Sequence, residues 1–410
     1  MSTPSIKVGQ GNWGIKALNL LGYANTDKKF VARDFTVGRL LNTATRVNAS
    51  GNIEGVNANV PRIDYFGGQA SLLVEPIAQN LLLQSQDFST TWAPLTGGTG
   101  VNPVITTNAV ISPDGTQNAE RVVLNRGAEN DLDDQSTLQQ NITIATSGAY
   151  IFSVYAKAST AGDVGKQVFI RIGFAGTLTP ITLTANWVRY SRAESSVTSG
   201  SQTVQIGNRG TVTAGNSVSV DLWGAQAESG SVATSYIPTT TGSVTRNADV
   251  ISLTGVAGLI GQTEGTIYAE VDIRSFNNVG FFATISDGTA SNLLGIYKFT
   301  DGKIYFDRIS ATQSATTTAG SSATYTAPTI LKIAIGYKSG ETLMYINGVA
   351  ATAQQTATFT FGTLTKVNIG SSRSDGTILN DRIRAVSIYQ TRLPNTTTDG
   401  SPSLQSITTL

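Results

Sequence analysis

Residues 266–273 read Thr266-Ile267-Tyr268-Ala269-Glu270-Val271-Asp272-Ile273, with an aliphatic side chain at every second position. Successive side chains of a β-strand point to opposite faces, so the four aliphatic residues share one face and the tyrosine and two carboxylates share the other. Residues 151–157 alternate in the same way, with Phe152, Val154 and Ala156 on one face. Because no long stretch follows a helical period, the sequence predicts an all-β protein.

Strand-length runs separated by Gly, Ser and Asn turns extend this pattern outward in both directions. Their spacing predicts two β-sandwiches, one over residues 80–250 and one over residues 251–393. Residues 1–79 contain only short extended pieces, so we expect an arm that wraps a neighbour, pairs with another chain or joins modules. The tail at residues 394–410 is linker-like, and we expect it to be peripheral.

The composition excludes several classes of function. The chain has 410 residues with no cysteine and no histidine, so neither a Ser-His-Asp nor a Cys-His catalytic arrangement can be built. A Cys/His zinc site and disulfides are excluded for the same reason. Charged residues make up only 13%, and the net charge of +1 gives no basic field for nucleic acid.

The hydropathy pattern predicts no membrane insertion and no ordinary secretion. No apolar run approaches the roughly 18 residues of a membrane-spanning helix. The first residues, 1–14, lack a basic segment followed by an apolar one, so they do not resemble a signal peptide. Release by lysis, inside a particle, would bring such a protein to a cell exterior.

One dense group of carboxylates is a candidate metal site. Hard oxygen ligands at this spacing suit Ca²⁺, although the glycine and terminal glutamate of an EF-hand are missing. A solvated acidic loop is the alternative interpretation, and catalysis is a further one, because glycoside hydrolysis needs two carboxylates roughly 5–10 Å apart. The candidate ligands are Glu129, Asp131, Asp133 and Asp134.

Aromatic side chains are the candidate glycan ligands. Sugars stack their C–H faces on flat rings while amides or carboxylates bind the hydroxyls. A role in packing is the alternative interpretation for each ring, and a trimer interface is a further alternative for the three tyrosines. The candidates are Trp92, Tyr297, Tyr305 and Tyr345.

The last third of the chain resembles the laminin-G/concanavalin-A-like family. Residues 343–349 form a strand that ends in an Asn-Gly turn, and residues 367–371 and 381–389 match the family's closing strands. The resemblance implies a lectin-like sandwich, and such domains hold glycans or proteins far more often than they catalyse.

Residues 80–240 resemble the jelly-roll, carbohydrate-binding-module-like domains of bacteriophage structural proteins. The lead-in at residues 45–48, 61–65 and 72–76 resembles segments that precede this domain in phage tail and appendage proteins. The resemblance is carried by residues 80–88, Trp92, 112–115, 119–122, 221–228 and 235–239, with residues 245–249 as the exit. It also implies that Trp92 packs in the first strand of this domain.

These resemblances and the missing catalytic residues predict a non-enzymatic structural protein of a phage particle, a tail or head fibre that adheres to host-surface glycan. Its expected partners are other virion proteins, reached through residues 1–79, the glycan, and copies of itself in a homotrimer. Many linked copies would multiply weak contacts. Three alternatives remain: a capsid or baseplate decoration, a polysaccharide-cleaving enzyme that uses carboxylates, and a cellular adhesin.

Overall fold

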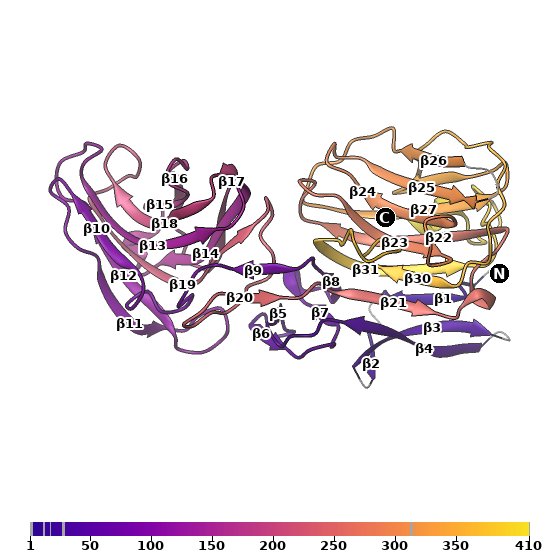
Figure 1. Cartoon of the computed structure of the whole chain (residues 1–410), viewed down its shortest axis with the longest axis horizontal. Helices are drawn as coiled ribbons and strands as arrows, with labels where there is room; N and C mark the ends of the chain where they lie inside the picture. Colours follow the sequence, from indigo (N-terminus) through magenta and orange to yellow (C-terminus); the bar gives the residue numbers. More distant parts are fainter. Residues whose placement is uncertain (1–2, 11–12, 17, 27–28, 312–314, 410) are drawn as a thin grey trace.

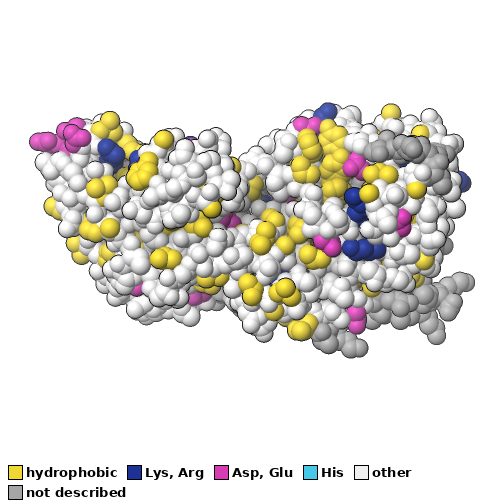
Figure 2. All heavy atoms as spheres, in the orientation of Figure 1, with side chains coloured by type: hydrophobic (Ala, Val, Ile, Leu, Met, Phe, Trp, Pro, Cys, Tyr) yellow, Lys and Arg dark blue, Asp and Glu magenta, His cyan; other side chains and the backbone are white. Residues whose placement is uncertain are grey.

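The structure is a computed structural model that describes residues 3–10, 13–16, 18–26, 29–311 and 315–409. These residues form strands β1–β31, one helix, α1 (Leu404–Thr408), and three short 3-10 turns, so the all-β prediction is confirmed. Figure 1 shows two sandwiches joined at a waist. Figure 2 shows mostly uncharged side chains on one face, with a hydrophobic patch over the sandwich that contains the C-terminus. In the described residues no helix is long and apolar enough to cross a membrane.

The insert sandwich, residues 81–243, consists of two five-stranded antiparallel sheets. Phe152 and Val154 are fully buried between them, on the face that the alternation of residues 151–157 predicts. One sheet has the order β10 (Ala93–Gly97), β13 (Gln135–Ile144), β18 (Gly200–Arg209), β15 (Gln167–Ile172) and β16 (Thr179–Thr182). The other has the order β11 (Val104–Val110), β12 (Ala119–Asn125), β19 (Ser217–Ser229), β14 (Gly148–Ala158) and β17 (Val188–Val197), and a 3-10 turn (Ala161–Asp163) follows β14.

The main sandwich also has two layers, and its core contains the aliphatic face of residues 267–273. In one layer β31 (Asp381–Tyr389) pairs with β22 (Glu264–Ile273), and β27 (Thr329–Lys338), β28 (Leu343–Ile346) and β29 (Val349–Ala350) follow. The other layer runs β21 (Val250–Thr254), β30 (Lys366–Ile369), β23 (Gly280–Ser286), β24 (Leu293–Lys298), β25 (Ile304–Ser310) and β26 (Ala315–Gly320). A 3-10 turn (Ala257–Leu259) follows β21.

The N-terminal segment is not a separate arm, because its strands complete the main sandwich. The free edge of β31 pairs with β1 (Ile6–Gly9) and β8 (Ser71–Val74), and β8 pairs with β7 (Arg62–Asp64). Strand β4 (Lys29–Gly38) pairs with β3 (Asn19–Thr26) in one layer and with β21 in the other, while β2 (Ile15–Lys16) pairs with β3. This pairing satisfies backbone hydrogen-bonding groups that an unpaired strand edge would leave exposed. Burial of Ile6 and Phe35 in the common core stabilises the arrangement further.

The insert sandwich therefore interrupts the main sandwich in sequence. The chain enters the insert through β9 (Ala78–Asn80) and leaves it through β20 (Val244–Arg246), and these two strands pair with each other. A small hairpin of β5 (Ala44–Val47) and β6 (Ile53–Val56) lies beside this crossing. The predicted boundaries near residues 79 and 250 mark the crossing, but residues 1–79 and 251–393 share one fold.

The C-terminal tail is not peripheral. Helix α1 packs on the outer face of the main sandwich, where Leu404 is fully buried beside Tyr268 and Tyr345. A capping box between Ser403 and Ser406 starts the helix. The aromatic outer positions of β22 and β28 give the tail an apolar surface to cover.

Candidate functional site: a cleft between the sandwiches

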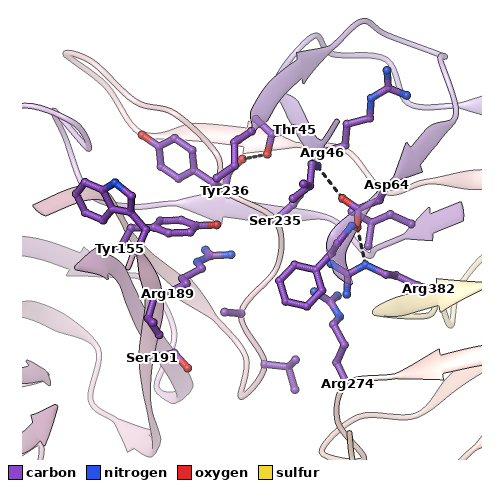
Figure 3. A pocket seen from close by; sticks show the side chains of 18 residues that line it. Thr45, Arg46, Asp64, Tyr155, Arg189, Ser191, Ser235, Tyr236, Arg274 and Arg382 are labelled. Atoms are coloured by element: carbon purple, nitrogen blue, oxygen red, sulfur yellow. Dashed lines mark hydrogen bonds and ion pairs between the residues drawn. The ribbon is translucent and has the colours of Figure 1, made fainter. Parts of the chain in front are cut away.

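A cleft of about 570 Å³ lies where the two sandwiches meet (Figure 3). Strands β14 and β17 form the wall on the insert sandwich. The β5–β6 hairpin, β7 and the 3-10 turn Phe66–Gly68 form a second wall from the N-terminal segment. Arg274 and Arg382 of the main sandwich, together with the loop at residues 232–236, close the cleft.

Four aromatic residues line this cleft; Tyr236 is buried, and the other three are at least partly exposed. Phe66 is 60% exposed, because it stands on a tight turn followed by two glycines with positive φ. Trp187 is half-buried and its Nε1 donates to the carbonyl of Ile111 at 3.1 Å, which leaves the ring fixed at the start of β17. Tyr155 of β14 is half-buried beside it. Because these rings are already held in place, stacking on a sugar would cost little side-chain conformational entropy.

The charged lining of the cleft is strongly cationic. Arg382 is buried, its Nε donates to Asp64 at 2.5 Å, and its guanidinium lies 4.5 Å from the ring centre of Phe66. Burial, and next the charge of Arg274, lower the pKa of Arg382. Figure 3 shows Arg189, Arg274 and Arg382 directed toward the same space. The charged residues that line the cleft are Arg46, Asp64, Arg189, Arg274 and Arg382.

Two of the predicted glycan ligands, Tyr297 and Tyr305, lie together on the outer face of β24 and β25. They belong to a cross-strand row in which Phe281 pairs with Tyr297, Tyr297 with Tyr305, and Tyr305 with Gly320. The ring centres are 4.8 Å and 5.7 Å apart at small interplanar angles. Nearly parallel rings at these separations are offset-stacked, so the neighbouring rings cover part of the surface that a sugar would use.

The other two predicted glycan ligands are core residues. Trp92 is 3% exposed, and its ring packs 5.0 Å from Phe88 just before β10. Tyr345 is 7% exposed beneath α1. Neither ring presents a face to solvent, because the apolar area of each is already buried within a sandwich or under the tail.

Three of the four predicted metal ligands come together. One carboxylate oxygen from each of Glu129, Asp131 and Asp134 lies within 4.8 Å of the others, whereas Asp133 is not in this group. Asp134 is fully buried; its Oδ1 accepts hydrogen bonds from Thr99, and its Oδ2 has no hydrogen-bond partner among the described residues. A buried carboxylate oxygen without a partner fits a cation ligand, so the Ca²⁺ site stays a prediction with these three residues as its ligands.

One carboxylate pair was missed by sequence reasoning. Asp87 and Glu120 line a pocket of about 350 Å³ at one end of the insert sandwich. Burial, with a smaller contribution from the charge of Asp87, raises the pKa of Glu120 to about 7. Glu120 accepts a hydrogen bond from the backbone N–H of Phe88 at 2.7 Å, and Asp87 accepts hydrogen bonds from the backbone N–H and the hydroxyl of Ser89. Both carboxylates therefore hold the backbone of residues 88–89 in place.

The sequence carried little signal for the cleft. Its aromatic members could have been suspected, since Trp187 opens a strand and Phe66 precedes a Gly-Gly turn. The arginines could not, because they come from segments far apart in the chain: Arg382 and Asp64 are separated by 318 positions.

No family model matches the chain. No curated protein matches it either. Among solved structures, similarity is found to the CBM40 domain of an IT-sialidase from Ruminococcus gnavus bound to α2,3-sialyllactose, at 16% identity and a TM-score of 0.32 over 38% of this chain and 91% of that one. The NanB sialidase of Streptococcus pneumoniae is 14% identical, with a TM-score of 0.30 over 35% of this chain and 25% of that one. A pentraxin from Limulus polyphemus is 13% identical, with a TM-score of 0.25 over 32% of this chain and 65% of that one.

Proposed function

We propose that this chain is a non-enzymatic structural protein of a phage particle that adheres to glycans on the host surface, and that the cleft between the sandwiches binds the glycan. The observation that carries the proposal is the cleft lining, in which the exposed ring of Phe66 and the fixed ring of Trp187 stand near arginine donors. Rings for stacking and a few convergent polar groups are the usual means of sugar recognition.

The phage role is supported by the resemblance of residues 45–76 and 80–240 to phage appendage proteins. Attachment to the particle through residues 1–79 is part of the proposal, and the β4–β5 connection offers apolar surface for it. There Leu40 is 76% exposed and Leu41 is 44% exposed. Assembly as a homotrimer is also proposed, because copy number would raise the avidity of a shallow sugar site.

Two alternatives have less support. A decoration protein would be expected to present polar outer loops without exposed aromatics, yet Phe66, Phe174 and Phe299 are exposed. An enzyme would need a reactive carboxylate pair in a sugar-binding groove. The lining of the pocket that holds Asp87 and Glu120 includes no aromatic residue, and the backbone already uses both carboxylates.

The test is binding of the full chain to host cells and to their isolated surface polysaccharide, with released oligosaccharide followed in the same samples. We expect saturable binding without product. The variant Phe66→Ala should weaken binding by about two- to tenfold, because stacking on one ring contributes about 0.5–1.5 kcal/mol. The matched control is Phe174→Ala, since Phe174 is 58% exposed but lies outside the cleft. Equal loss in both variants, or none in either, would refute the cleft as the site.

A further inference from the structure

The junction behind the cleft holds more cations than carboxylates, and all of these groups except Arg274 are buried. Among the described residues, ion pairs join five cations to three carboxylates, and the whole set is connected through shared partners. Buried charges are costly unless they are paired, so the excess leaves a positive potential at this place. The cations are Arg39, Arg62, Arg246, Arg274 and Lys298, and the carboxylates are Glu75, Asp249 and Asp381.

Beside this junction Arg382 pairs with Asp64, but not all of the N–H donors of Arg382 have a partner. Arg382 is 5% exposed, and its Nη1 is buried without a hydrogen-bond partner among the described residues. Its Nε is taken by Asp64, and Asp64 also accepts the backbone N–H of Val47 at 2.7 Å. A guanidinium carries five N–H donors and stays charged, so a buried free donor of this kind suits an anionic acceptor.

Arg189 brings a second under-used cation to the same space from the opposite wall (Figure 3). Its Nη1 donates to the carbonyl of Thr234 at 2.6 Å and its Nη2 to the hydroxyl of Ser153 at 2.9 Å. None of the ion pairs among the described residues includes Arg189, and its Nε is buried without a partner. The carboxyl of Glu228 is near, but burial raises its pKa, which weakens it as a counter-charge.

We propose that the cleft binds the carboxylate of an acidic sugar residue, held between Arg382 and Arg189 with Arg274 close by, while the neighbouring rings stack on the sugar. This inference rests on the proposed function and adds the class of glycan. A carboxylate is planar and accepts two parallel N–H bonds from a guanidinium, which a neutral hydroxyl cannot do. Sulfate or phosphate esters share the negative charge but not the planar geometry.

The experiment compares the full chain on a glycan array that carries neutral, hexuronic-acid-containing and sulfated glycans, followed by titration of the best acidic glycan and its carboxyl-reduced form. We expect carboxylated glycans to bind at least tenfold more tightly than their reduced forms, because hydrogen bonds to a charged acceptor are stronger than those to a neutral hydroxyl. Binding should also weaken as salt rises.

Two variants and a control locate the site. Arg189→Gln should reduce the affinity for the acidic glycan about tenfold and change the affinity for a neutral glycan little. Arg382→Lys keeps the charge but should also lose the preference for the acidic glycan over the neutral one. Arg171→Gln is the control, because Arg171 also has a buried Nε without a partner but does not line the cleft.

The outcomes separate the two proposals. Binding of neutral glycans alone, sensitive to Phe66→Ala, would keep the proposed function and refute the acidic-sugar inference. A preference for sulfated glycans would refute the carboxylate. No binding to any glycan or to host polysaccharide would refute both. An equal effect of Arg171→Gln and Arg189→Gln would refute the assignment to the cleft.

Discussion

Glu75 is the residue whose change should disturb the junction most. It is fully buried and its carboxylate faces three arginines, with Arg62 at 2.7 Å, Arg274 at 3.3 Å and Arg246 at 3.4 Å. It also accepts hydrogen bonds from the backbone and hydroxyl of Ser235, at 2.8 Å and 2.7 Å. These contacts join the N-terminal segment, the crossing strand β20 and the two sandwiches at one point.

Glu75→Gln keeps the size of the side chain and removes its charge. Removing one partner of a buried ion pair costs about 3–5 kcal/mol, because the remaining charge stays buried without compensation. Arg62 and Arg246 are both fully buried, so we expect a loss in the free energy of unfolding at the upper end of that range. A total stability of about 5–15 kcal/mol makes this a large loss.

The assay is urea unfolding of both proteins, followed by tryptophan fluorescence. The control is Glu264→Gln, because Glu264 and its partner Lys338 form an exposed pair at 3.5 Å and should contribute about 0–1 kcal/mol. If Glu75→Gln cost no more than Glu264→Gln, the reasoning that the junction depends on charge compensation would be refuted.

The pH dependence gives a second readout of the same change. Burial by itself would raise the pKa of Glu75, but the charges of Arg62, Arg246 and Arg274 hold it well below the ordinary value of 4.5. The native state therefore binds fewer protons than the unfolded state around and below that pH. The stabilisation is complete above about pH 4.5 and is lost as the pH falls toward the lowered pKa. Glu75→Gln should lack this acid-dependent loss.

Three further changes test other parts of the structure. The pKa of Glu120 is raised to about 7 in the folded state, so the free energy of unfolding should fall by about 2–3 kcal/mol as the pH rises from about 4.5 to 7. Urea unfolding at several pH values should show that Glu120→Gln abolishes this dependence. An unchanged pH dependence in the variant would refute the assignment to Glu120. Ca²⁺ should raise the melting temperature of the protein and of Asp133→Asn, but not of Asp134→Asn, and absence of any rise in the parent protein would show that the cluster binds no calcium. Asn80→Ala should cost about 2–4 kcal/mol, because the buried amide of Asn80 bonds four backbone groups, whereas Gln79→Ala at the exposed neighbour should change little; similar values for the two would contradict this role.

Some of the candidate site could be inferred from local sequence, and the rest could not. The carboxylates at residues 129–134 are neighbours in the chain, so their clustering was predictable, although only the fold separates Asp133 from the other three. Tyr297 and Tyr305 were found from alternation, but their mutual stacking depends on strand register. Tyr345 was placed on an outer face, and alternation does not reveal that the tail covers this face. Trp92 packs in the core of the insert sandwich, which is the packing role given as its alternative.

By itself the sequence determined that the protein is all-β, which faces of the strands are apolar, and where the chain crosses between sandwiches. These properties depend on a side-chain period of two residues and on turn residues, and both are local. The tertiary structure decided that the N-terminal strands complete the main sandwich, that the tail covers its outer face, and that arginines converge on a cleft. Those contacts join Ser5 to Ile388 and Asp64 to Arg382, and alternation says which way a side chain points but not which strand will pair with it.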